Sequence, residues 1–287
     1  MRKNIVHILP ATERITGEKI IVLETLPNEA FNANPFIRLQ HHPPADIPAC
    51  SQYERLRPHP HRGFALVTFM LQGESFHKDS DGNDAIIKPG DVQYMFAGKG
   101  LLHSEGPSAQ YIECGGPYEY IQLWLNVPAE HKLDPPTYQR AVKAAIPSAI
   151  DDLGVNIRLP MGNYQSMQAP IQTFTPTTAL FGELVNNHDI LLTVPSGEHT
   201  LLYVANGSVT INDDEDNLIT EHHLVVFESE NNEVKITADG SAQILFLSAM
   251  PLQEPIQVSG NFVMNTEEEI KQAYSDEIEG NYGELPY

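Results

Sequence analysis

The sequence predicts an all-β protein made of two tandem antiparallel β-barrels with a C-terminal helix, and three observations lead to this class. First, 41% of the residues are apolar, and 22 Pro and 19 Gly are spread along the chain, which is typical of a turn-rich β protein. Second, apolar β-rich runs bounded by Gly or Pro turns recur in both halves. Third, residues 57–76 and 194–211 share one rhythm, in which a polar stretch leads into an apolar strand that ends at a Gly turn.

The length of 287 residues suits two domains, since a domain usually has about 100–200 residues. We expect residues 1–135 to form the first barrel, residues 150–250 the second, and residues 251–287 a C-terminal strap and helix. Residues 130–152 combine charge, a Pro pair and a short Ala-rich run, and are expected to cross between the two domains.

The charge balance excludes some partners. With 17 basic and 38 acidic residues the formal charge is −21, which argues against direct, non-specific binding of nucleic acid. No run of about 18 apolar residues is present, so no membrane span is predicted. The first residues lack the pattern of a secretory signal, which favours the cytoplasm. Cys50 and Cys114 give no disulfide framework and are expected to be free, buried thiols.

The first barrel is expected to begin with strands in residues 16–40. Residues 41–58 are rich in Pro and polar side chains, which predicts a surface loop. His41 and His42 in this stretch are adjacent, so they would face opposite ways and are weak candidates for metal ligands. Residues 120–127 form a strongly apolar run that would complete the first sheet, with Trp124 in the core.

Four candidate metal ligands lie in two pairs with the same spacing. His59 and His61 are two residues apart, as are His103 and Glu105, so each pair would point to one side of its own strand. The residues between the pairs predict antiparallel β-structure, with an Asp-Gly hairpin turn at residues 80–84. Two such strands side by side would bring three imidazoles and one carboxylate together. His77 lies near this motif in sequence and is expected to be an exposed hairpin residue.

This ligand set suits a borderline divalent transition metal. Imidazole and carboxylate together favour Fe, Mn, Co, Ni, Cu or Zn over Ca or Mg, which prefer oxygen ligands alone. Structural zinc sites are commonly closed and rich in Cys, so three His and one Glu favour an open catalytic centre. The sequence therefore predicts one metal bound by His59, His61, His103 and Glu105.

The second half repeats the strands without a second pair of ligands. His199 stands alone at the corresponding position, and the adjacent His222 and His223 are expected to be surface or turn residues. Near the C-terminus, Thr266 and Glu269 have the spacing of a capping box, which predicts a helix over residues 266–279.

The motifs in residues 57–107, PHPHRGF, LQGE, DSDGN and IKPGDVQYMFAGKGLLHSE, resemble the metal-binding barrel of the pirin family in the cupin superfamily. The stretch EPIQVSGNFVMNTEEEI also resembles the pirin ending. The resemblance implies a bicupin that binds one metal, usually iron, through the four residues above, with a metal-free second barrel and a C-terminal segment that packs back on the first. Many pirins have Glu where this chain has Ala65, so the chemistry near the metal is expected to differ.

The resemblance leaves two functions open. Pirins resemble quercetin 2,3-dioxygenases, which implies a small aromatic substrate and O2, with Glu105 as ligand and as base for the substrate hydroxyl. The alternative is a non-catalytic, iron-dependent regulator that binds a transcription factor or a metabolic enzyme. Arg57, Arg62 and Lys99 could give such a partner a positive rim near the site. In either case we expect a monomer.

Overall fold

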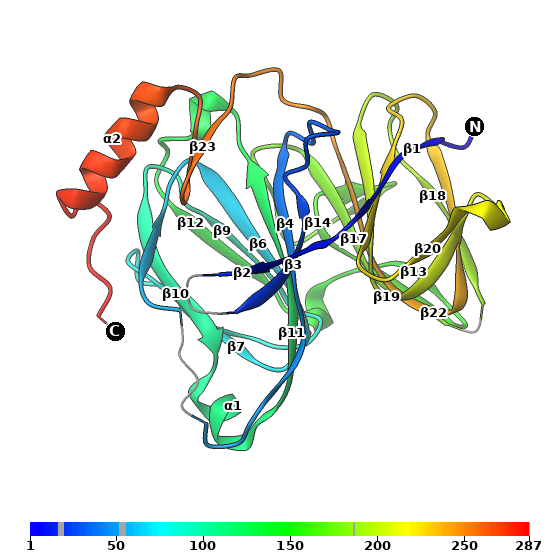
Figure 1. The fold of residues 1–287 in the computed structure, drawn as a ribbon, viewed down its shortest axis with the longest axis horizontal. Helices are drawn as coiled ribbons and strands as arrows, with labels where there is room; N and C mark the ends of the chain where they lie inside the picture. The colour runs from blue at the N-terminus through cyan, green and yellow to red at the C-terminus, as the bar shows by residue number, and fades with distance from the viewer. Residues whose placement is uncertain (17–19, 52–55, 186, 287) are drawn as a thin grey trace. The chain divides into compact units, whose positions relative to one another are not determined.

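The computed structural model describes residues 1–16, 20–51, 56–185 and 187–286, and its elements are mostly β-strands (Figure 1). The chain divides into two compact units. Unit 1 comprises Met1–Thr12, Leu23–Ala33 and Ala144–Pro251, and unit 2 comprises Glu13–Val22, Asn34–Lys143 and Leu252–Tyr287. The prediction of a mostly β protein with two tandem β-domains is confirmed.

Unit 2 contains two main sheets and two α-helices, and one strand of its larger sheet, β3 (Ile21–Leu26), continues beyond Val22 into the residues of unit 1. The four-stranded sheet has the order β5-β10-β7-β8, and the seven-stranded sheet has the order β12-β9-β6-β11-β4-β3-β2. The elements are β2 (Thr12–Ile15), β3 (Ile21–Leu26), β4 (Phe36–Ile47), β5 (His59–His61), β6 (Phe64–Gln72), β7 (Ser75–Asp79), β8 (Asp84–Ile87), β9 (Val92–Phe96), β10 (Leu101–Pro107), α1 (Ala109–Cys114), β11 (Gly116–Asn126), a 3-10 turn (Ala129–His131), β12 (Thr137–Ala141), β23 (Gln257–Ser259), β24 (Phe262–Met264) and α2 (Glu267–Ile278).

The core of unit 2 is built from alternate residues of its strands. Phe64 and Leu66 of β6 point to the same side and pack with Trp124 of β11, Met95 of β9 and Leu101 of β10. Since Leu101 belongs to the four-stranded sheet and the others to the seven-stranded sheet, this cluster joins the two sheets. The burial of Trp124 agrees with its predicted place in the core.

The turn that the sequence predicts within unit 2 is confirmed. β7 and β8 pair as a hairpin around residues 80–83, where Gly82 has φ +93°. The Asp79 carboxylate accepts hydrogen bonds from the backbone N–H groups of Asp81 and Asn83, which closes the turn.

Two predictions about this region were wrong, and two of its elements were not predicted. β4 continues to Ile47, so His41 and His42 lie on a strand rather than in a surface loop. The helix α1 and the strand β12 were not expected. In the described residues the strand orders run from one edge strand to another, so the sheets are open rather than closed barrels.

Unit 1 holds a nine-stranded antiparallel sheet with the main order β1-β21-β19-β22-β17-β14-β13. Because β1 pairs with β21, the first residues of the chain belong with residues 144–251, which differs from the predicted range 1–135. The elements are β1 (Ile5–Pro10), β13 (Ser148–Asp152), β14 (Val155–Met161), β15 (Asn163–Tyr164), β16 (Met167–Gln168), β17 (Thr177–Val185), β18 (Asp189–Thr193), β19 (His199–Ile211), β20 (Leu218–Thr220), β21 (His223–Phe227) and β22 (Glu233–Ala249), with 3-10 turns at Lys143–Ala145 and Glu215–Asn217.

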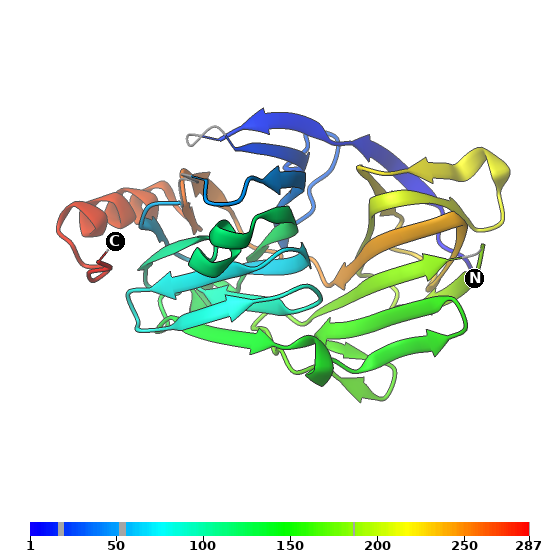
Figure 2. The ribbon, with the colours of Figure 1, turned by 90° about the horizontal axis from the view of Figure 1, so that it is seen from below.

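The C-terminal helix α2 is confirmed almost to the residue. Thr266 is its N-cap, and its side chain accepts from the Glu269 N–H while the Glu269 carboxylate accepts from the Thr266 N–H, which completes the capping box. α2 and the β23–β24 hairpin lie on the same side of unit 2 in both views (Figures 1 and 2). Asp276 of α2 forms an ion pair with Arg62, which directly follows β5. No helix among the described residues is long and apolar enough to span a membrane.

Candidate metal centre

Three histidines of unit 2 meet on one face of the four-stranded sheet. β5 and β10 pair antiparallel with His59 opposite His103 and His61 opposite Leu101. His59 and His61 share a face because they are two residues apart, and His103 faces the same way as its partner His59. One ligand atom from each imidazole lies within 4.8 Å of the others. The structure therefore brings together the three histidines that the two sequence pairs singled out.

The backbone sets the tautomer of two of these rings. His59 Nδ1 lies 2.8 Å from the Arg57 carbonyl oxygen, and His61 Nδ1 lies 3.4 Å from the Asn261 carbonyl oxygen. A carbonyl oxygen only accepts, so each Nδ1 carries the proton and donates it. Each Nε2 is then left with a lone pair, which is the form that binds a metal.

The separation of two nitrogens fits a shared cation. His61 Nε2 and His103 Nε2 lie 3.0 Å apart. Two imidazole nitrogens that each lie about 2.1 Å from one metal are about 3.0–3.4 Å apart, for angles from a right angle to the tetrahedral angle. Burial is the main cause that lowers the pKa of His61 and of His103 well below the ordinary value, with a smaller effect of the charge on His59. Both rings are therefore neutral near pH 7, as a metal ligand must be.

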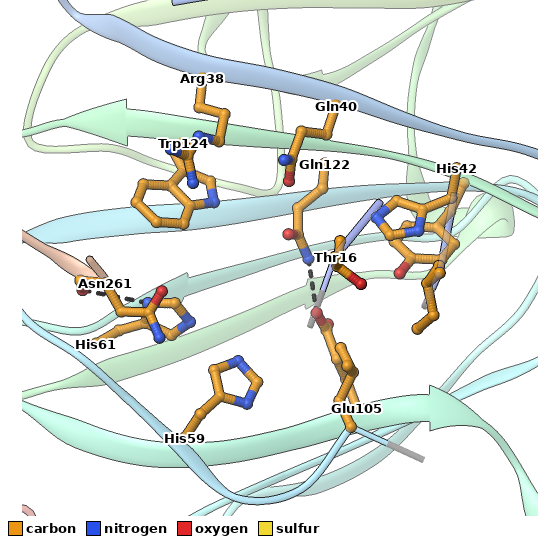
Figure 3. Close-up of a pocket in the computed structure, with 13 residues that line it drawn as sticks. Thr16, Arg38, Gln40, His42, His59, His61, Glu105, Gln122, Trp124 and Asn261 are labelled. Carbon is orange, nitrogen blue, oxygen red and sulfur yellow. Dashed lines mark hydrogen bonds between the residues drawn. The ribbon is translucent and has the colours of Figure 1, made fainter. Parts of the chain in front are cut away.

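The fourth predicted ligand, Glu105, lies beside this cluster. It follows His103 by two residues on β10 and is 5% exposed. Its Oε1 accepts a hydrogen bond of 2.7 Å from the Gln122 Nε2, which Figure 3 shows as a dashed line. The carboxylate oxygens lie outside the tight group that the three imidazole nitrogens form. Glu105 thus shares the site with the histidines and is oriented from across it by Gln122.

The site opens into a pocket of about 280 Å³ whose opposite wall comes from β4 and β11. Pairs of facing residues in these two strands line the wall: Trp124 lies opposite Arg38, Gln122 opposite Gln40, and Tyr120 opposite His42 (Figure 3). Thr16, Ile20, Leu56, His59, His61, Glu105 and Asn261 complete the lining.

Two aromatic contacts stiffen this wall. The Arg38 guanidinium carbon lies 4.4 Å from the centroid of the Trp124 ring, a cation–π contact. The His42 ring stacks on Tyr120 at 3.9 Å. Burial, and after it the neighbouring His41, lowers the pKa of His42 to about 3, so this ring is neutral at physiological pH. Trp124 Nε1 and His42 Nδ1 are buried without a hydrogen-bond partner in the described protein, so two polar atoms of the wall are left for a ligand.

The other histidines that the sequence raised have separate roles. His41 faces away from His42, as expected, and its Nε2 lies 3.0 Å from the fully buried Glu119 carboxylate. The prediction for His77 was wrong, because its side chain is fully buried and its Nε2 lies 3.1 Å from Asp79 Oδ2. His77 lies opposite Glu105 on β7, and its ring centroid lies 5.6 Å from that of His103, so His77 packs beside the cluster on the same face of the sheet. In unit 1, His199 packs against Phe31, and His223 contacts Thr220.

Three further predictions need correction or refinement. Arg62 is no part of a positive surface rim, because it is 7% exposed and paired with Asp276. Cys50 and Cys114 are exposed rather than buried. Ala65 is fully buried and alternates with Phe64 and Leu66 on β6, so it faces away from the core cluster that these two share with Trp124. It is absent from the pocket lining.

Gly63 and Lys132 fix the backbone that directly follows His59 and His61. Gly63 has φ +83°, and a Cβ atom there would lie 2.1 Å from the Val263 carbonyl oxygen, so only glycine fits. The Lys132 ammonium donates to the Gly63 carbonyl at 2.7 Å, to Asn126 Oδ1 at 2.6 Å and to the Val263 carbonyl at 3.1 Å. This buried lysine ties the backbone next to His61 to the C-terminal segment.

Sequence reasoning missed most of the pocket wall. Gln122, Arg38 and Gln40 are polar residues at alternate positions of strands that otherwise read as apolar, which is the signal that could have found them. Asn261 acts through its backbone oxygen on His61, and the side-chain pattern carries no trace of such a contact.

The fold and the site define a two-domain cupin protein with a histidine cluster in one of its units. Two family models match the chain: the pirin model over residues 21–125 and the pirin C-terminal cupin domain over residues 181–283. The chain belongs to the pirin family.

Named relatives and solved structures agree with this assignment. A Pseudomonas aeruginosa protein, provisionally named a quercetin 2,3-dioxygenase, is 36% identical over 250 residues, which cover 87% of this chain and 86% of the relative. Human pirin is 34% identical over 221 residues, which cover 76% of this chain and 74% of pirin. A crystal structure titled quercetin 2,3-dioxygenase from Acinetobacter baumannii has a TM-score of 0.93 at 34% identity, with both chains covered completely.

Proposed function

We propose that this protein is a metal-dependent dioxygenase that opens flavonols such as quercetin with O2 at a mononuclear centre. The observation that carries this proposal is the convergence of His59, His61 and His103 beside a pocket lined by aromatic and amide side chains. Relatives named as quercetin 2,3-dioxygenases support the choice of substrate class.

The proposed roles of the ligands follow from their surroundings. His59, His61 and His103 would hold the ion through nitrogens whose lone pairs are free, and Glu105 would be the fourth ligand. A bound ion would supply a Lewis-acidic and, for most of the candidate metals, redox-active centre for O2 and for a substrate oxygen. We propose Fe(II), while Mn, Co, Ni, Cu and Zn suit the same donor set.

Glu105 is also the proposed general base. Its carboxylate borders the pocket and would accept the proton of the substrate hydroxyl that approaches the metal. The Gln122 amide holds one carboxylate oxygen at 2.7 Å, which leaves the other oxygen for the ligand role or for the proton. Gln122 would therefore keep the carboxylate directed into the pocket while it binds the metal and while it accepts the proton.

The pocket wall suits a planar aromatic substrate with hydroxyl and carbonyl groups. Trp124 and Tyr120 offer aromatic surface, and Gln40 and Arg38 offer donors beside it. The buried N–H of Trp124 would find its acceptor in a substrate oxygen.

Turnover with defined metals tests this proposal. Protein loaded anaerobically with Fe(II), and separately with Mn, Co, Ni and Cu(II), is mixed with quercetin and O2, and the loss of both is followed. We expect at least one metal to give turnover that His103→Ala abolishes and that the matched control His223→Ala retains. Absence of turnover with every metal would overturn the dioxygenase proposal.

The second candidate is an iron-dependent regulator that binds a basic protein. A formal charge of −21 favours a partner of opposite charge through electrostatic attraction. In this case the Fe(II) and Fe(III) forms of the wild-type protein should differ in affinity for one partner. The form that binds this partner more tightly should also bind it more tightly than His103→Ala does. Equal capture by all three forms would exclude metal-dependent regulation.

A further inference from the structure

The two cysteines of the chain lie outside the proposed chemistry and are both exposed. Cys50 follows the end of β4, and Cys114 is the last residue of α1. Neither thiol belongs to the proposed metal site. Exposure matters here because an oxidant must reach a thiol in order to react with it.

The backbone places these residues side by side. β4 and β11 pair up to Ile47 opposite Gly116, so the residues just beyond Ile47 run next to those just before Gly116. The Cys50 N–H donates to the Ile112 carbonyl at 2.8 Å. The Ser51 N–H donates to the Pro48 carbonyl at 3.2 Å, which fixes the turn that carries Cys50.

The sulfur of Cys50 already points at the peptide bond that precedes Cys114. Its Sγ lies 3.6 Å from the Glu113 carbonyl oxygen. On the other side of Cys114, a Cβ atom on Gly115 would lie 2.6 Å from the Ala49 nitrogen. The residues before and after Cys114 therefore touch Cys50 and Ala49, a closeness in keeping with the Cα separation of about 4.4–6.8 Å that a disulfide requires.

We propose that Cys50 and Cys114 are a reactive dithiol that forms a reversible intramolecular disulfide with a low-molecular-weight disulfide such as oxidised glutathione as the oxidant. One cysteine thiolate attacks a glutathione sulfur, the glutathione S–S bond breaks, and a mixed disulfide forms as one glutathione thiolate leaves. The second cysteine thiolate attacks the protein sulfur of that mixed disulfide and displaces the second glutathione. The two protein thiols lose two electrons and two protons, and one glutathione disulfide becomes two thiols.

The bond would close the part of the chain that carries the whole proposed metal site. His59, His61, His103 and Glu105 all lie between Cys50 and Cys114 in sequence. The bond would also join the end of β4, which carries Arg38, Gln40 and His42, to the segment that follows β10.

Oxidation of the metal-loaded protein tests the proposal. The full chain is loaded with Zn(II), which has no redox chemistry of its own, and treated with oxidised glutathione. We expect both thiols to disappear, the mass of the chain to fall by about 2 Da because two hydrogens are lost, and a cross-linked peptide pair to contain Cys50 and Cys114. Dithiothreitol should restore both thiols.

Single variants separate an intramolecular bond from independent reactions. Cys50→Ser and Cys114→Ser should each keep one glutathione as a stable adduct, because no second thiol is present to displace it. Two glutathione adducts on the wild-type chain, cross-linked dimers, or unreacted thiols would each overturn the proposal. This test is independent of the dioxygenase proposal, since it needs neither quercetin nor O2.

Discussion

Glu105 of β10 accepts a hydrogen bond from Gln122 of β11. The Glu105 carboxylate has two proposed roles, as a metal ligand and as a general base. The side chain is 5% exposed, and one of its oxygens is occupied by the Gln122 amide. A neutral amide in place of the carboxylate keeps the shape and removes both the negative charge and the ability to take a proton. Replacing the Glu105 carboxylate by an amide therefore tests its chemistry separately from folding.

We expect Glu105→Gln to reduce turnover of quercetin by about 10²–10⁴-fold, because a general base and a charged ligand are lost together. The unfolding temperature of the metal-free protein should change little, since the hydrophobic core of unit 2 does not depend on this charge. Steady-state kinetics and thermal unfolding of the same preparations make the comparison. Full activity in this variant would show that Glu105 is neither ligand nor base.

Gln122→Leu keeps a similar volume and removes the donor to Glu105. We expect turnover or metal affinity to fall by about 10–100-fold, as is usual when a partner that orients a ligand is lost. The half-buried Gln139 of β12 lies outside the pocket lining, so Gln139→Leu is the matched control. Equal kinetics and equal metal affinity in both variants would remove Gln122 from the site.

At the scale of elements, Lys132 joins the β5–β6 connection to β24. Its ammonium is 1% exposed and has three oxygen acceptors, one of which belongs to the C-terminal segment. Burial lowers the pKa of Lys132 to about 7, and the charges of Glu254 and Glu269 oppose this shift. The contact between these elements should therefore depend on pH.

The direction follows from proton binding. Between pH 7 and about 10.4 the folded state has lost the Lys132 proton while the unfolded chain still holds it, so the free energy of unfolding rises with pH over this range. Denaturant titrations of wild type and Lys132→Met should show a stability difference that shifts in favour of wild type as the pH rises. A difference that stays constant from pH 7 to pH 10 would contradict the lowered pKa.

The capping box of α2 makes a second prediction at this scale. Thr266→Ala removes the side chain that accepts from the Glu269 N–H and should cost about 1 kcal/mol of stability. Lys271→Ala on the exposed face of the same helix, where the nearest ion pair spans 3.8 Å, should cost less than about 0.5 kcal/mol. Urea unfolding of both variants decides whether the cap contributes.

At the scale of the whole molecule, each unit has its own hydrophobic core, and the histidine cluster belongs to unit 2. We expect metal analysis to give about one metal per chain, with none left in a His59→Ala and His103→Ala double variant. His199→Ala in unit 1 should leave the content unchanged. A stoichiometry near two would show that unit 1 also binds a metal.

The spacing of the histidines shows how much of the site can be predicted from the sequence. Alternation along a strand was enough to place His59 with His61 and His103 with Glu105, and the capping box was enough to place α2, because both patterns act between residues a few positions apart. The same reasoning expected His77 at the surface and His41 and His42 in a loop. Those errors arose because burial depends on which strand lies alongside, and sequence neighbours do not reveal it.

Local patterns in the sequence were therefore enough to predict the all-β class, the helix and the two pairs of candidate ligands. The folded chain was needed to show that β5 pairs with β10 in the register that joins the three histidines. It was also needed to show that Gln122 and the Asn261 backbone hold Glu105 and His61 from distant parts of the chain. The folded chain also places Cys50 beside Ile112 and Glu113, next to Cys114 in sequence, and β1 in unit 1. The physical reason is that pairing register and burial are settled by contacts between segments far apart in sequence, which local spacing does not encode.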